Sequence, residues 1–118
     1  MTQIILVEEN DTLNDLIAIN INTYLGADII KRKNATDTIA LLAILPEVDL
    51  IITHNKVKSE NTAEKLADYI RENKLNTPII VLGPTRYIES ENLIHIHNEV
   101  DWENVVHSAA KVLGINEN

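Results

Sequence analysis

Three short segments of the chain are continuously apolar, and this feature most restricts the fold that the sequence can adopt. They are residues 4–7 (IILV), 50–52 (LII) and 79–82 (IIVL). Strands that are buried on both faces of a parallel sheet have this composition, because helices cover each face. The segments at 28–31 (DIIK) and 93–97 (LIHIH) are shorter or alternate with polar residues, so we expect each to be an edge strand.

Helical periodicity fills the spaces between these segments. Apolar residues recur every three or four positions in three stretches. The stripes consist of Leu13, Leu16, Ile17, Ile21 and Tyr24; of Ala63, Leu66, Ala67 and Ile70; and of Trp102, Val105, Val106, Ala109 and Leu113. A further apolar helix is expected over 35–45, with Asn34 as its N-cap and Pro46 just after its end. Strands alternating with helices predict an α/β three-layer sandwich wound by right-handed crossovers.

Length, charge and cysteine content restrict the class of protein. The 118 residues fit one domain, which we place at 1–115, followed by a polar tail at 116–118. The formal charge of −8 argues against a nucleic-acid partner, because phosphate binding depends on clustered Lys and Arg. The absence of cysteine excludes disulfides and thiolate metal ligands and favours a cytoplasmic location. No segment is long and apolar enough for a signal peptide or a membrane span, so no membrane association is expected.

Polar side chains follow the first and the third apolar segments, where each strand should end. Glu8 and Glu9 follow the first segment, and His54 follows the third. The carboxyl ends of parallel strands form one edge of the sheet, and open α/β folds place their sites at that edge. We therefore expect two carboxylates and one imidazole to converge there.

Over nearly its full length the chain resembles the receiver domain of response regulators, which has the chemotaxis-regulator-like fold. The resemblance rests on ILVEEN at 5–10, VDLII at 48–52, the segment 66–71, TPIIVL at 77–82 and the last amphipathic helix. It implies a flavodoxin-like, five-stranded parallel sheet of strand order 2-1-3-4-5. The family pattern between the fourth and fifth strands is about seven residues longer than in this chain, so the fourth helix should be shortened or absent.

The resemblance also implies where the phosphorylation site of the family would lie. In receivers two acidic residues hold Mg²⁺, an aspartate accepts the phosphoryl group, and a Ser or Thr and a lysine complete the site. The residues at these positions are Glu8 and Glu9, His54, Gly83, and Asn98 or its neighbour His97. Only the acidic pair is retained.

These replacements remove the chemistry of the family. His54 supplies neither the carboxylate that would form an acyl phosphate nor a hard oxygen ligand for Mg²⁺. Gly83 and Asn98 lack the hydroxyl and the ammonium that would bond the phosphoryl oxygens. We therefore predict a pseudo-receiver that does not switch by aspartyl phosphorylation, binds no cofactor and is not an enzyme. With only three glycines, the chain also lacks a dinucleotide fingerprint and a P-loop.

Several roles remain open for His54. As an imidazolium held between Glu8 and Glu9, it would replace the missing cation. As a neutral histidine, it would simply be hydrogen-bonded at a strand end. Less favoured alternatives are a transition-metal site with Glu8, Glu9 and His97 as further ligands, and a phosphohistidine. No metal site is predicted.

The predicted function is that of an interaction module in two-component-type signal transduction, with a signalling protein, an output domain or a second copy as its partner. Receivers commonly dock through the edge formed by the fourth and fifth strands and their helices. The resemblance thus implies a partner surface of Tyr87, Ile88, His95, His97 and Trp102, although Trp102 also lies on an apolar stripe that favours the core. The alternative is a switch that still responds to a metal ion or to phosphorylation of another residue, such as Asp49 or Asp11.

Overall fold

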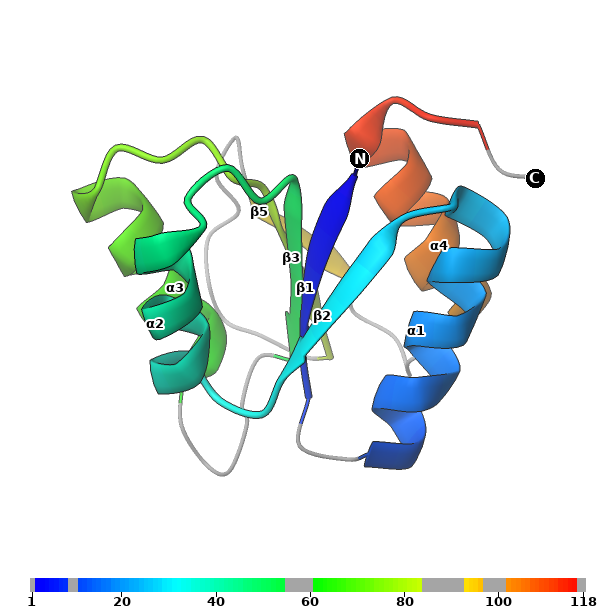
Figure 1. Ribbon diagram of the computed structural model, residues 1–118, viewed down its shortest axis with the longest axis horizontal. Helices are drawn as coiled ribbons and strands as arrows, with labels where there is room; N and C mark the ends of the chain where they lie inside the picture. The colour runs from blue at the N-terminus through cyan, green and yellow to red at the C-terminus, as the bar shows by residue number, and fades with distance from the viewer. Residues whose placement is uncertain (1, 9–10, 55–60, 84–92, 97–101, 117–118) are drawn as a thin grey trace.

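The computed structural model describes residues 2–8, 11–54, 61–83, 93–96 and 102–116, which form a parallel sheet between two layers of helices (Figure 1). The strand order is β2-β1-β3-β4-β5, and every neighbouring pair is parallel. The predicted α/β class with a parallel sheet is confirmed. The elements are β1 (Gln3–Val7), α1 (Asp11–Leu25), β2 (Asp28–Arg32), α2 (Ala35–Ile44), β3 (Leu50–His54), α3 (Thr62–Glu72), β4 (Ile79–Leu82), β5 (Leu93–Ile96) and α4 (Trp102–Leu113).

Alternation along the central strands divides the core into two halves. Ile4 and Leu6 of β1 pack in the cluster that includes residues of α1 and α4, whereas Ile5 and Val7 pack in the cluster that includes residues of α2 and α3. Figure 1 shows these helix pairs on opposite sides of the sheet. Both faces of β1 are therefore apolar, because successive side chains of a strand point to opposite faces and each face is covered by helices.

The strand register brings the carboxyl ends of β1, β3 and β4 to one level. Val7 pairs with Thr53, and His54 pairs with Leu82. The backbone N–H of Glu8 donates to the carbonyl of Arg32 on β2 at 3.1 Å. The hydrogen bonding between β1 and β2 therefore extends one residue beyond β1. Glu8 and His54 thus stand side by side at the carboxyl edge.

Several predicted helix boundaries are confirmed, and one is corrected by a single residue. The side chain of Asn34 accepts a hydrogen bond from the backbone N–H of Asp37 at 2.8 Å, as an N-cap does. Gly26 follows α1 with φ of +67°, a conformation that costs glycine little. The helix predicted over 35–45 ends at Ile44, and Leu45 is its C-cap.

The helix that we expect to be shortened or absent would lie between β4 and β5. Residues 84–92 lie outside the described part of the chain, so this prediction remains a prediction. Among the described residues, no helix combines the length and apolar character that a membrane crossing requires.

Candidate functional site

The side chains of Glu8 and His54 are in contact at the carboxyl edge of the sheet. The imidazole Nε2 of His54 contacts the carboxylate Oε2 of Glu8. Both side chains are largely shielded, with 22% of the His54 side chain and 7% of the Glu8 side chain exposed. The predicted convergence of these two residues is confirmed, whereas Glu9 lies outside the described residues.

The contact has an electrostatic consequence for the site. A carboxylate removed from water is costly unless a partner compensates its charge or bonds its oxygens. Here a ring nitrogen of His54, on the neighbouring strand β3, contacts Oε2. The geometry therefore provides the Glu8 carboxylate with a partner that belongs to the chain itself.

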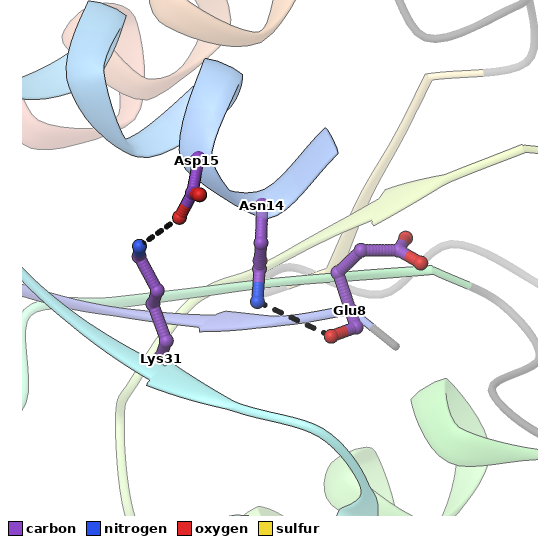
Figure 2. A network of polar contacts seen from close by, with 4 residues as sticks. All are labelled: Glu8, Asn14, Asp15 and Lys31. Atoms are coloured by element: carbon purple, nitrogen blue, oxygen red, sulfur yellow. Dashed lines mark hydrogen bonds and ion pairs between the residues drawn. The ribbon is translucent and has the colours of Figure 1, made fainter. Parts of the chain in front are cut away.

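Asn14, in the first turn of α1, forms a hydrogen bond to the backbone of Glu8. Its side chain is buried, and its Nδ2 donates to the backbone carbonyl of Glu8 at 3.2 Å (Figure 2). One residue further along, Asp15 forms an ion pair with Lys31 of β2. Together these contacts tie the beginning of α1 to the ends of β1 and β2. Sequence reasoning missed Asn14, although a polar residue beside the apolar positions Leu13 and Ile17 is a signal of a buried polar contact.

A side-chain hydrogen bond at the end of β3 and a positive φ just after β4 are further features of this edge. The hydroxyl of Thr53, a fully buried residue, donates to the carbonyl of His54 at 3.0 Å. Gly83, just after β4, has φ of +90°, and a Cβ atom added there would meet no atom within 4 Å. Space alone therefore does not exclude a side chain at this position, but the backbone conformation is one that residues with a side chain rarely adopt.

Of the two acidic residues considered for an alternative switch, Asp49 does not lie at this site. Asp49 precedes β3, at the opposite edge of the sheet from His54. Its carboxylate accepts a hydrogen bond from the backbone N–H of Gln3 at 2.8 Å, and its own N–H donates to the carbonyl of Gln3. Asp11 is the first residue of α1. Asp49 therefore anchors the start of β1 and does not join Glu8.

Much of the predicted partner surface lies outside the described residues. Five of the residues predicted for that surface or for the site are not described, namely Glu9, Tyr87, Ile88, His97 and Asn98. His95 is placed by its backbone, which pairs with Val81. Trp102 is half-buried against the core, and its ring stacks on Tyr24 with a centroid separation of 5.6 Å.

The described residues contain no group of three or more His, Cys, Asp or Glu side chains arranged to hold a metal ion. The less favoured transition-metal set needs Glu9 and His97, which lie outside those residues. Within the described part, the site is therefore one carboxylate and one imidazole in contact. The contact limits the orientations of the imidazole ring and places a ring nitrogen against the carboxylate.

The fold is that of response regulator receiver domains. A receiver domain protein from Bacillus halodurans matches with a TM-score of 0.80 at 20% identity, over 94% of this chain and 96% of that one. A receiver protein from Sinorhizobium medicae gives a TM-score of 0.81 at 14% identity, over 96% and 94%. A chemotaxis protein from Vibrio cholerae gives 0.77 at 13% identity, over 96% and 99%. No family model and no curated protein matches the sequence.

Proposed function

We propose that this chain is a degenerate receiver that acts as a non-catalytic interaction module in two-component-type signalling in the cytoplasm, and that it does not switch by aspartyl phosphorylation. The observation that carries the proposal is the contact between His54 Nε2 and Glu8 Oε2. It lies where the resemblance to receivers would place the acceptor aspartate opposite the acidic pair.

The chemistry of phosphoryl transfer supports this proposal. An acyl phosphate needs a carboxylate as acceptor, and the transferred group needs a divalent cation to offset its charge. His54 provides no carboxylate, and its ring nitrogen already contacts an oxygen of Glu8 that a hard cation would use. The left-handed backbone at Gly83 also disfavours the Ser or Thr that receivers use beside the phosphoryl group.

An interaction role is supported by the fold together with the lost chemistry. The similar structures include one that is named a chemotaxis protein. When a domain of this fold lacks the residues for phosphorylation, binding to a signalling protein, an output domain or a second copy is the activity that its surface can still perform. This step rests on fold-level analogy.

The proposal is tested by offering the protein the reagents that a working receiver uses. Acetyl phosphate with Mg²⁺ should give no mass increase of one phosphoryl group. Beryllofluoride with Mg²⁺ should leave the amide NMR signals of Glu8, His54 and Gly83 unmoved. A phosphoryl group on any carboxylate of the chain would overturn the proposal, and its location would show whether Asp11 or Asp49 serves the alternative switch.

The variant His54→Asp provides the matched comparison. It introduces a hard oxygen ligand at the end of β3 and removes the imidazole from the Glu8 carboxylate. We expect Mg²⁺ to bind this variant at least about tenfold more tightly than the parent chain, as measured by titration calorimetry. Equally tight Mg²⁺ binding by the parent chain would show that the His54–Glu8 contact does not exclude the cation.

A further inference from the structure

Helix α1 has a second apolar face in addition to the one that it buries. Ile17, Ala18 and Ile21 of this helix are buried in the core. On the opposite side, Leu16 is 45% exposed and Ile19 is 63% exposed. These are two of the three large hydrophobic side chains that are exposed in the described part of the chain; the third is Ile44 of α2.

The exposed face has the spacing of a helix-pairing seam. Thr12, Leu16, Ile19 and Thr23 follow one another at intervals of four, three and four residues, which is the a/d pattern of a heptad repeat. All four residues are exposed and uncharged. Asp15, which lies beside the seam, is an ion-pair partner of Lys31. An uncharged seam favours association, because charged residues are depleted at the centres of protein interfaces.

We infer that the solvent-facing side of α1 is a docking surface for a second copy of this chain, with the two α1 helices packed antiparallel across a twofold axis. The sequence of the seam, Thr-Leu-Ile-Thr, has the same character in both directions. An antiparallel pair therefore places Leu16 against Ile19 of the second copy and Thr12 against Thr23 of the second copy. A twofold interface requires this self-complementarity, since both copies contribute the same patch.

Helix electrostatics favour the antiparallel arrangement over the parallel one. Each helix end carries a partial charge, positive at the N-terminus and negative at the C-terminus. Antiparallel packing places the N-terminus of each α1 beside the C-terminus of the other, whereas parallel packing places like ends together. Antiparallel packing also separates the two copies of Asp15 along the helix axis.

The size of the seam limits the affinity. A helix of 15 residues is about 22 Å long. One such helix contributes well under the roughly 800 Å² per partner that stable complexes bury. The dimer is therefore weak and concentration-dependent. This inference rests on the proposed function and deepens it, because it names one partner of the interaction module and the surface that binds it.

Sedimentation equilibrium of the full chain, from about 10 μM to about 1 mM, tests the inference directly. The parent chain should show a reversible monomer–dimer equilibrium within this range. Ile19→Glu should raise the dissociation constant by about tenfold or more, because it places a charge against Leu16 of the second copy. Ile44→Glu is the matched control, since it makes the same change at an exposed isoleucine on α2 and should leave association unchanged.

A charge exchange distinguishes the two helix directions. Leu16→Lys and Ile19→Glu should each weaken association, and the double variant L16K/I19E should recover it, because antiparallel packing joins unlike charges across the axis. Parallel packing would join like charges and give no recovery. The chain has no native cysteine, so a mixture of Thr12→Cys and Thr23→Cys chains should form the mixed disulfide in preference to either homodimer.

The possible outcomes separate this inference from the proposed function. A parent chain that remains monomeric throughout the range, or an Ile44→Glu variant that alone dissociates the dimer, overturns the α1 interface. Neither result changes the response to Mg²⁺, acetyl phosphate and beryllofluoride, on which the proposed function depends. Circular dichroism and the fluorescence of the single tryptophan verify that each variant is folded before its mass is measured.

Discussion

A polar residue at each end of β3 contacts a residue in β1 or directly after β1, but the two contacts differ in kind. Before the strand, the carboxylate of Asp49 accepts a hydrogen bond from the backbone N–H of Gln3, and Asp49 is exposed. At the end of the strand, His54 meets the largely buried carboxylate of Glu8. Water can replace the partner of Asp49, whereas it has little access to Glu8.

The difference teaches where the chain depends on one particular side chain. Removing an exposed hydrogen-bond partner costs little, because solvent takes its place. Removing the imidazole takes a contact away from a largely buried carboxylate that water cannot readily reach, and we expect that cost to be several times larger. The carboxyl edge of the sheet is therefore the end at which stability and the proposed loss of phosphorylation chemistry depend on the same residue.

The largest expected effect comes from His54→Ala. Loss of the imidazole leaves the Glu8 carboxylate without its partner on β3, so the free energy of unfolding should fall by about 3 kcal/mol. Urea unfolding followed by the fluorescence of Trp102, the single tryptophan of the chain, measures this change.

The control for that substitution is a double-mutant cycle with Glu8→Gln. The double variant E8Q/H54A should be more stable than the sum of the single effects predicts, because Glu8→Gln removes the carboxylate that loses its imidazole contact in His54→Ala. Additive effects would show that the two side chains do not interact energetically in solution.

Substitution of Gly83, at the same edge of the sheet, should have an intermediate effect on the free energy of unfolding. Gly83→Ala should lower the free energy of unfolding by about 1–2 kcal/mol, because φ of +90° is strained for a residue with a Cβ atom. The cost is one of backbone conformation, since no atom lies within 4 Å of the added carbon. Gly26→Ala, at φ of +67°, should cost less, because it is closer to the left-handed helical region that other residues can enter. Thermal unfolding of both variants decides the order.

Asp49→Ala should cost about 1 kcal/mol, the value of one exposed hydrogen bond. Asp49→Asn retains an oxygen acceptor for the N–H of Gln3 and should cost less than Asp49→Ala. Chemical unfolding of the two variants beside His54→Ala tests the comparison of the two ends. The comparison fails if Asp49→Ala is as destabilising as His54→Ala.

The smallest effect should come from Lys31→Met. Its ion pair with Asp15 joins β2 to α1, but both side chains are largely exposed. The free energy of unfolding should change by less than about 0.5 kcal/mol. At high salt the variant and the parent chain should have the same free energy of unfolding, because salt screens the ion pair. Unfolding curves at low and high ionic strength provide the measurement.

Local sequence patterns predicted much of the fold. The segment 79–82 is β4 with the same bounds, and 28–31 and 93–97 correspond to the edge strands β2 and β5. Strand ends were less well predicted: the polar residue Glu8 follows β1, whereas His54 still belongs to β3. Hydrogen bonding between strands decides where a strand ends, and it depends on residues far away in the sequence.

The candidate site was predicted only in part, because some of its contacts join elements that are far apart in the sequence. Polar residues after apolar segments indicated Glu8 and His54, because carboxyl ends of parallel strands share one edge. Asn14 was not predicted, since its role is a bond to a backbone carbonyl of another element. Asp49 was considered as a phosphorylation site from its residue type alone, and the structure places it at the other edge of the sheet.

The sequence by itself determined the order of the elements, the apolar character of the central strands and the absence of a carboxylate at the end of β3. These properties follow from residue type and local periodicity. Only the tertiary structure decided that the predicted convergence of Glu8 and His54 is a direct contact, that Asp49 binds Gln3 and that Leu16 and Ile19 remain exposed. Contact and exposure depend on which elements pack together, because register and helix placement join residues that local sequence does not connect.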